Sequence, residues 1–313
     1  MNHLSIWAAV ALVLIGCQAS DKPQTSVSAG NAQASSLPTP ERFFEEHPSF
    51  DQYWYQNKAE LTRYALRQAR YGEVHDGEAV LIFVTEDFLP RVQVKHEHGE
   101  SSDAISVLKL NAYRRFYTGI YPYTVMTSSF TPADGAPTLK LSNTVQEWCG
   151  QVYSQINRRD DGLHTLMHSY FQNEADQKTL LPEAVLEDGI WARIRIAPNQ
   201  IPEGSYDIVP ALEYVRMRHK ALRPYPAVLT RAPLTTTELV DHPVTALRVH
   251  YPALSRDLVI YYDSEPPHVI HAWEEQEGPF RTTAVRTHAI LDDYWHHNSV
   301  DDAPYREALG LRY

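Results

Sequence analysis

Cys149 is the residue whose type most directly suggests chemistry, and it lies in the stretch VQEWCGQ at 145–151. A catalytic thiolate needs a neighbouring imidazole that lowers its pKa and hydrogen-bond donors that stabilise an oxyanion. Cys149, His164 and His168 therefore form a candidate catalytic set for a cysteine-dependent hydrolase. The local signatures of papain-like and caspase-like proteases are absent. The alternative interpretation is a buried cysteine that packs as a small apolar residue beside Trp148 at a strand end.

Metal binding is the other chemistry that the histidines suggest. His164 and His168 have the i, i+4 spacing of a zinc-protease helix, but Thr165 stands where the glutamate base belongs, and the segment alternates like a strand. On a strand the two side chains would lie about 13 Å apart, too far for one ion. Two further groups, His-Glu-His at 96–98 and Asp-Asp with His-His at 292–297, are explained more simply as a solvated loop and as charges near a short helix. Because a site needs three or four convergent ligands, we predict no metal and no cofactor.

Paired carboxylates occur at 86–87, 187–188 and 274–275, and adjacent residues of a strand point apart. A glycosidase instead needs two carboxyls about 5–10 Å apart across a cleft. The G-x-S-x-G nucleophile elbow, the P-loop and the dinucleotide fingerprint are all absent. These absences favour a noncatalytic protein and leave the cysteine-dependent hydrolase as an alternative.

The chain carries 28 basic and 39 acidic residues, which gives a formal net charge of −11. This acidic balance argues against nucleic acid as a partner and against direct adhesion to anionic lipid headgroups. The two cysteines are Cys17 and Cys149. If Cys17 is acylated, no internal disulfide can form and the fold must be held by its core.

The N-terminus has the pattern of an export signal. Residues 6–15 are an apolar run of ten, which is too short to span a bilayer as a helix. The residues Leu-Ile-Gly-Cys at 14–17 resemble the lipobox of bacterial lipoproteins, which implies cleavage before Cys17 and acylation of that cysteine, for example with palmitate. We therefore expect a lipoprotein signal peptide at 1–16 and lipidation at Cys17, which anchors the chain to a bilayer.

Residues 17–40 join this anchor to the rest of the chain. They contain no aromatic residue and too little apolar surface to offset the entropy of ordering, so we expect a disordered tether with a reach of about 25 Å. Gln18, rather than an aspartate, follows Cys17. In lipoproteins of double-membraned bacteria this favours the periplasmic face of the outer membrane.

The body of the chain alternates between apolar and polar residues from residue 60 onward, which predicts antiparallel strands. The apolar run 79–84, after a turn signal at 75–77, predicts a central strand entered through a hairpin. Further strands are expected at 105–117, 121–130, 138–148, 163–171, 206–217, 244–251, 257–262, 268–273 and 282–291. Helices are expected from about residue 40, at 182–196 and at 302–309. We therefore predict a mainly β fold, a strongly curved antiparallel sheet or incomplete β-barrel with a few covering helices. It would form a single domain at 41–313, with a possible second lobe from about residue 201.

Several stretches resemble an uncharacterised family of bacterial envelope lipoproteins. They cover most of 51–311 and include YWY at 53–55, QARYGE at 68–73, AVLIFVTEDF at 79–88, TGIYPY at 118–123, QEWCG at 146–150 and IWARIR at 190–195. Members are often called septum formation inhibitor Maf, a name that does not fit. True Maf proteins are cytoplasmic nucleotide pyrophosphatases with an early phosphate-binding motif, and this chain has no comparable motif. The resemblance implies an envelope lipoprotein and supplies no activity.

These patterns predict a membrane-anchored lipoprotein whose partners are the bilayer, through Cys17, and an apolar ligand or an envelope protein held by the concave sheet. The aromatic residues available for that surface are Tyr113, Phe116, Tyr117, Tyr121 and Tyr123, unless they only pack the core. The alternatives are a cysteine-dependent hydrolase that uses Cys149 and a purely structural or assembly role. A dry, fully packed interior would argue against an internal ligand.

Overall fold

Strands make up most of the chain that the computed structural model describes, which is residues 48–99 and 101–311. The predicted signal peptide at 1–16, Cys17 and the tether at 17–40 lie outside the described residues. The strands are β1 Ala59–Arg70, β2 Glu73–Leu89, β3 Val94–Lys95, β4 Ile105–Thr118, β5 Tyr121–Pro132, β6 Lys140–Glu147, β7 Gly150–Arg159, β8 Gly162–Ser169, β9 Gln177–Leu181, β10 Val185–Leu186, β11 Gly204–Val209, β12 Tyr225–Leu234, β13 Val244–Tyr251, β14 Arg256–Tyr262, β15 Ile270–Glu277 and β16 Phe280–Asp292. The helices are α1 Phe50–Trp54, α2 Glu187–Ile196, α3 Leu212–Met217 and α4 Ala303–Ala308, with short 3₁₀ turns η2 Pro198–Gln200, η3 Pro252–Leu254, η4 Tyr294–His296 and η5 Val300–Asp302.

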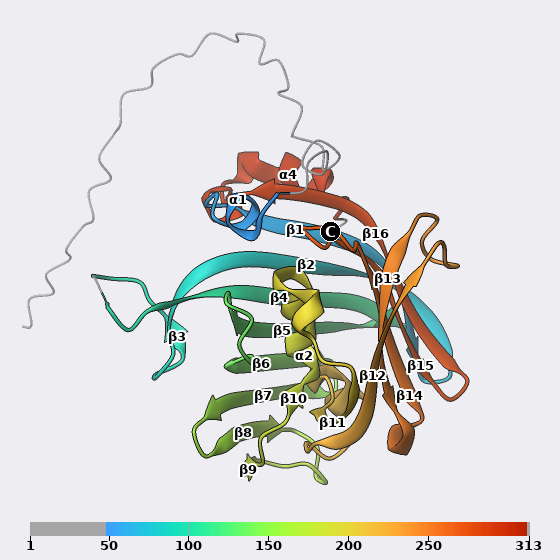
Figure 1. Cartoon of the computed structure of the whole chain (residues 1–313). Helices are drawn as coiled ribbons and strands as arrows, with labels where there is room; N and C mark the ends of the chain where they lie inside the picture. Colours follow the sequence, from blue (N-terminus) through green and yellow to red (C-terminus); the bar gives the residue numbers. More distant parts are fainter. Residues whose placement is uncertain (1–47, 100, 312–313) are drawn as a thin grey trace, which may run out of the picture. The chain divides into compact units, whose positions relative to one another are not determined.

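The strands join in one sheet that is not closed into a barrel (Figure 1). Their order is β10-β11-β12-β13-β14-β15-β16-β1-β2-β4-β5-β6-β7-β8-β9, with β3 beside β2. Neighbours pair antiparallel, apart from the parallel pair of β10 and β11. The predicted mainly β fold with few helices is confirmed. The strands after residue 201 continue this same sheet, because β16 pairs with β1.

The alternation in sequence sets which side chains face the interior of the curve. In β13, Leu247, Val249 and Tyr251 are buried whereas Arg248 is exposed. The buried residues of this strand join a core cluster that includes residues from both halves of the sheet. The inner face of the sheet therefore forms the main core.

Helix α2 lies against the inner face of the sheet, where it contacts β4 and β5 (Figure 1). Ile190, Trp191 and Ile194 belong to the main core cluster, and the Trp191 ring meets that of Trp273 on β15 edge to face, with centroids 5.1 Å apart. An edge-to-face pair of this kind adds about 0.5–1.5 kcal/mol to the burial of the two rings. The helix thus fills the interior of the curve and touches strands on both sides.

The first hairpin turns at a different place from the one predicted. Its turn is formed by Tyr71 and Gly72, which both have positive φ, and the predicted turn residues 75–77 lie inside β2. Gly77 faces β4 so closely that a Cβ atom would lie 2.4 Å from the carbonyl oxygen of Arg115. The glycine in the sequence therefore marks a close approach of two strands and not a turn.

Two other predicted elements differ from the observed ones. The predicted strand 206–217 ends at Val209, and α3 follows it. The predicted helix 182–196 begins at Glu187, because Val185 and Leu186 pair with β11. Apolar residues are dense in both segments, so alternation alone did not separate strand from helix. None of the helices within residues 48–99 and 101–311 is long and apolar enough to cross a bilayer.

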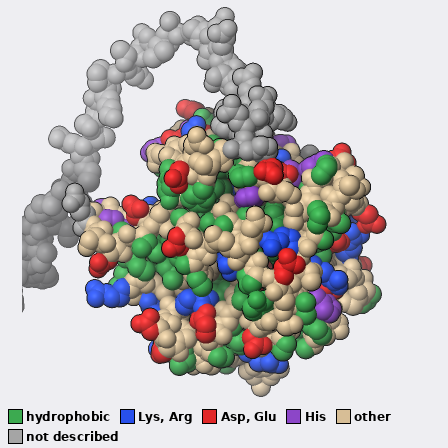
Figure 2. All heavy atoms as spheres, in the orientation of Figure 1, with side chains coloured by type: hydrophobic (Ala, Val, Ile, Leu, Met, Phe, Trp, Pro, Cys, Tyr) green, Lys and Arg blue, Asp and Glu red, His purple; other side chains and the backbone are tan. Residues whose placement is uncertain are grey.

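Basic and acidic side chains are interspersed on the face of the molecule that Figure 2 shows. Apolar side chains lie between them in small groups. This face therefore presents no extended region of one charge sign, as a phosphate-rich partner would require.

Candidate functional site

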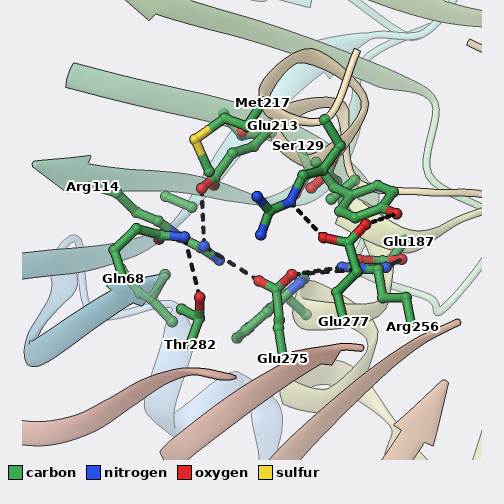
Figure 3. Close-up of a pocket in the computed structure, with 18 of the residues that line it drawn as sticks. Gln68, Arg114, Ser129, Glu187, Glu213, Met217, Arg256, Glu275, Glu277 and Thr282 are labelled. Atoms are coloured by element: carbon green, nitrogen blue, oxygen red, sulfur yellow. Dashed lines mark hydrogen bonds and ion pairs between the residues drawn. The ribbon is translucent and has the colours of Figure 1, made fainter. Parts of the chain in front are cut away.

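A pocket of about 50 Å³ lies on the inner side of the sheet, beside α2 and α3 (Figure 3). Its polar residues continue the inward-facing rows of the strands. On β15, Trp273 packs in the core and Glu275 and Glu277 follow at intervals of two. On β4, Leu110 is likewise followed on the same face by Arg114. The inner face thus changes from apolar to charged at the pocket.

Arg256 forms the deepest ion pair of the pocket. Its Nη1 and Nη2 atoms donate to the two carboxylate oxygens of Glu187 at 2.6 and 2.7 Å, and both side chains are 1% exposed. The hydroxyl of Tyr251 donates to Glu187 at 2.6 Å. Nη2 of Arg256 also donates to Glu275 at 2.9 Å. A bidentate pair with these added hydrogen bonds holds both charges in fixed positions.

Arg114 links two carboxylates on opposite sides of the pocket (Figure 3). Its Nη1 atom lies 3.0 Å from Glu213 on α3 and 3.3 Å from Glu275 on β15. Close by, the amide nitrogen of Gln68 donates to the hydroxyl of Thr282 at 3.2 Å. Residues of five different elements therefore meet here, at sequence separations of up to more than two hundred residues.

The solvent side of the pocket is formed by partly exposed residues. Glu277 accepts from Nε of Arg218 at 2.5 Å and from the hydroxyl of Tyr214 at 2.9 Å. Arg218 and Glu277 are both 22% exposed, and Phe280 is 38% exposed. These three residues border the route by which a solute would reach the buried part.

Carboxyl groups outnumber arginines in the pocket lining by five to three. Burial, together with the negative charges of Glu187 and Glu213, raises the pKa of Asp188 to about 7, although the backbone N–H of Leu212 that donates to this carboxylate opposes the effect. Burial also raises the pKa of Glu213 to about 7, although Arg114 opposes this effect. Burial disfavours the ionised form of Glu275 as well, but the attraction of Arg256 and Arg114 prevails and lowers its pKa to about 2. The pocket therefore contains two carboxyl groups that change protonation near neutral pH.

Two buried polar atoms of the pocket lining have no hydrogen-bond partner among the described protein residues. They are Oε1 of Gln68 and Oγ of Ser129, whose residues are 3% and 1% exposed. An unpaired buried acceptor costs about 1–3 kcal/mol, so such atoms require a partner. Both side chains border the same pocket (Figure 3), which makes it the candidate functional site.

The candidate catalytic residues are not brought together. Cys149 lies in the turn between β6 and β7, while His168 pairs with Tyr153 and His164 with Asn157 across β7 and β8. At about 3.3 Å per residue, the two histidines lie roughly 13 and 26 Å along the sheet from Cys149. They bond instead to carboxylates, His164 to Asp161 at 2.7 Å and His168 to Asp176 at 3.2 Å.

Cys149 itself is exposed, and so is Trp148, which is 68% exposed. The alternative of a buried cysteine beside Trp148 is therefore wrong, although the placement at a strand end is correct. The Glu147 carboxylate raises the pKa of the Cys149 thiol through a hydrogen bond and its negative charge. The backbone N–H of Cys149 also donates to Glu147 at 2.6 Å. This environment disfavours the thiolate.

The five aromatic residues considered for a ligand surface do not border the pocket in the described structure. Phe116 and Tyr123 are buried and stack at 4.9 Å within the main core. Tyr117 is 46% exposed, and its hydroxyl accepts from Arg115 at 2.5 Å. The aromatic residues thus mostly serve packing. The pocket is lined by charged residues, of which the sequence analysis weighed only Glu187, Asp188 and Glu275, as members of carboxylate pairs, and set them aside.

Among the histidine groups considered from sequence, Asp292, Asp293 and His297 lie close together, with ligand atoms within 4.8 Å of one another. His297 bonds to Asp292 at 2.7 Å. His96 and His98 lie in the loop after β3, where His98 is exposed. The signal for the pocket was available in the sequence as charged residues at inward positions of strands, for example Arg114 and Glu275.

Comparison with known proteins gives no functional assignment. No family model matches the chain, and no curated protein matches it. Among solved structures, the chain is similar to the β-barrel-like protein of domain of unknown function DUF1849 from Brucella abortus, with a TM-score of 0.46 and 9% sequence identity. The similarity covers 75% of this chain and 98% of that chain. Function therefore has to be argued from the site itself.

Proposed function

We propose that this chain is a noncatalytic, lipid-anchored lipoprotein of the bacterial envelope whose folded domain binds the cationic group of a small polar ligand in the interior pocket. The observation that carries the binding proposal is the pair of unpartnered buried acceptors, Gln68 Oε1 and Ser129 Oγ, in a pocket with an excess of carboxyl groups. The anchoring rests on the N-terminal pattern that ends at Cys17.

The charge of the pocket favours a cation over an anion. With all groups ionised, the five carboxylates exceed the three arginines by two negative charges. The raised pKa values of Asp188 and Glu213 express the same imbalance, because neither carboxyl has enough positive charge nearby to compensate for burial. A cation that entered the pocket would supply the missing positive charge. It would be bound more tightly when the carboxyl groups of Asp188 and Glu213 are ionised.

The unpartnered atoms specify a ligand that donates hydrogen bonds. A carboxamide oxygen such as Gln68 Oε1 only accepts, and a serine hydroxyl can accept as well. A primary ammonium group is positively charged and carries three N–H donors. It therefore matches both the charge and the two acceptors of the pocket.

The size of the pocket favours a small ligand or the end of a larger one. A cavity needs about 10–15 Å³ to hold one water-sized group, so a pocket of about 50 Å³ holds roughly three to five such groups. An acyl chain would exceed this volume and would leave the charged lining without compensation. For this reason we favour a polar ligand over the apolar ligand expected from sequence.

The hydrolase alternative has less support. Cys149 is exposed, its environment disfavours the thiolate, and the two candidate histidines bond to aspartates elsewhere on the sheet. An envelope protein remains the alternative partner, bound through the outer surface and not through the pocket.

The test uses ethylammonium chloride as the probe and sodium acetate as a probe of similar size and opposite charge. With a ceiling of about 1.5 kcal/mol per non-hydrogen atom, three atoms correspond to a Kd no tighter than roughly 0.5–1 mM. At 100 mM ethylammonium we expect at most about 3 kcal/mol of stabilisation, measured by urea unfolding of the full chain in detergent. The effect should be larger at pH 8 than at pH 6, because Asp188 and Glu213 ionise between these values.

Ser129→Ala removes one acceptor with a minimal change of shape, and we expect it to weaken the ethylammonium effect several-fold. Ser154→Ala is the matched control, because Ser154 is also buried on a neighbouring part of the sheet but does not line the pocket. Equal stabilisation by acetate, or an unchanged effect in Ser129→Ala, would contradict the proposal.

A further inference from the structure

Three potential metal ligands meet at the end of the β14–β15 hairpin that is remote from the pocket. They are His242, Asp263 and His271, and their ligand atoms all lie within 4.8 Å of one another. Nε2 of His271 lies 2.8 Å from Oδ1 of Asp263. The rings of His242 and His271 are nearly perpendicular, with centroids 4.5 Å apart. Three side chains from separate segments therefore converge on one point.

An irregularity in the sheet places His271. Tyr261 pairs with Ala272 and Tyr262 pairs with Ile270, so His271 is the extra residue of a β-bulge. A bulge changes the direction of a side chain relative to regular pairing, and bulges are frequent beside functional sites. Asp263 follows β14 directly, and its backbone N–H donates to the carbonyl of Val269 at 2.9 Å. The hairpin thus holds both Asp263 and His271.

The loop between β12 and β13 brings His242 to the same place. The hydroxyl of Thr237 accepts from the backbone N–H groups of Leu239 and Val240 at 3.0 and 2.9 Å, which forms a tight turn. Val240 is buried and packs in a small cluster with Tyr261 and Ala272. His242 is two residues further along, so this cluster fixes the loop beside the bulge.

We propose that His242, Asp263 and His271 bind a divalent transition-metal ion such as Zn²⁺. Two imidazoles and one carboxylate are a donor set suited to Zn²⁺, and three protein ligands leave a further position for water or another ligand. Ligand atoms about 2.0–2.2 Å from a tetrahedral Zn²⁺ lie roughly 3–3.6 Å apart, so side-chain adjustments of about 1 Å suffice. The proposal is independent of the ligand pocket, because the two sites share no residue.

Neighbouring groups orient the ligands as outer-shell residues do in metal sites. Nδ1 of His242 lies 3.2 Å from Oδ1 of Asp241, which leaves Nε2 of His242 for the metal. Nδ1 of His268 lies 3.1 Å from the carbonyl oxygen of Asp263 and braces the turn that carries this ligand. The side chain of His242 is 44% exposed and that of Asp263 is 34% exposed, so an ion can reach the site from solvent.

The cluster of Asp292, Asp293 and His297 is a weaker candidate for a transition metal. It offers one imidazole, and that ring stacks on Tyr305 with centroids 3.8 Å apart. Imidazole ligands suit Zn²⁺, Cu²⁺ and Ni²⁺, whereas carboxylate-rich sites suit harder cations. The two clusters can be separated by mutation.

The experiment titrates ZnCl₂ alone into the full chain, purified in detergent and freed of metal with a chelator, and measures heat release. Co²⁺ replaces Zn²⁺ in a second titration, because its visible absorption reports the number of ligands. We expect one Zn²⁺ per chain and a loss of affinity of more than about 100-fold in His242→Ala, since even outer-shell changes cost about 10–100-fold. His242 lies in a loop and is half exposed, so this substitution leaves the core intact.

His271→Ala should weaken Zn²⁺ binding as strongly as His242→Ala. His250→Ala, which changes a partly exposed histidine on β13 bonded to Asp257, and His297→Ala are the controls and should leave affinity unchanged. Melting temperatures of the metal-free variants verify that each one folds. The proposal is overturned if the chain binds no Zn²⁺, if affinity persists in His242→Ala, or if it is lost in His297→Ala.

Discussion

At the scale of residues, the main feature of this molecule is the number of charges inside the curve of the sheet. Arg195 and Arg256 are almost fully buried, and each donates to both oxygens of one carboxylate, those of Glu60 and Glu187. A buried charge is tolerated when it is paired and hydrogen-bonded in this way. These pairs keep polar groups in fixed positions, which a pocket that recognises a charged ligand requires.

The reactivity of the Cys149 thiol tests whether this protein is a cysteine-dependent hydrolase. We expect iodoacetamide to label Cys149 in the folded Cys17→Ser chain, because the thiol is exposed. The rate should rise with pH to a midpoint above the value of about 8.5 for a free thiol, because the Glu147 carboxylate raises the pKa of Cys149 by opposing formation of the thiolate. Alkylation rates from pH 6 to pH 10 measure this midpoint.

Glu147→Gln removes the negative charge and should move the labelling midpoint of Cys149 to lower pH. A wild-type midpoint below about 8 would mean an activated thiolate and would favour the cysteine-dependent hydrolase over the noncatalytic function.

At the scale of elements, α2 determines how the interior is filled. Gly189 interrupts the apolar pattern of this helix in the sequence, and the structure explains the interruption. A methyl group at residue 189 would lie 2.1 Å from the hydroxyl oxygen of Thr138, just before β6. Glycine thus allows the helix to approach the sheet closely at this one point.

Gly189→Ala is therefore expected to destabilise the protein by up to about 2 kcal/mol, since an overpacking cost of about 1–3 kcal/mol outweighs the gain of about 1 kcal/mol in helix propensity. The free energy of unfolding in urea measures the effect. In a Thr138→Gly background the same substitution should cost at least about 1 kcal/mol less, because the colliding side chain is gone. Strictly additive effects would show that Thr138 is not what requires glycine at residue 189.

At the scale of the whole described domain, α2 connects distant parts of one sheet. Arg195 at its end pairs with Glu60 on β1, and Glu187 at its start pairs with Arg256 on β14. The strands after residue 201 also pair with the first strands through β16 and β1. The strands on both sides of α2 should therefore unfold together.

Glu60→Gln is expected to lower the free energy of unfolding by about 3–5 kcal/mol, because it leaves Arg195 buried without its counter-charge. Far-UV circular dichroism and tryptophan fluorescence should follow one common transition. Asp257→Asn is the control, because its partner Arg248 is half exposed and such pairs contribute about 0–1 kcal/mol. Two separate transitions would show that the strands after residue 201 form an independent unit.

The sequence by itself determined the mainly β class and many strand positions. Alternation is a local property with a period of two residues, so 244–251 was predicted as a strand and observed as one, and 257–262 differs from β14 by one residue. Charged residues at inward positions, such as Arg114 and Glu275, were visible but could not be connected. Whether these residues form a common site depends on which strands are neighbours in the sheet.

Only the tertiary structure decided where chemistry can occur. Gln68, Ser129 and Glu213 border one pocket because strand order, register and the placement of α3 bring them together from distant parts of the chain. His242 and His271 meet because a bulge directs one of them and a loop held by the buried Val240 directs the other to the same point. Pairing and curvature result from the packing of the whole sheet, and no local pattern of residues specifies them.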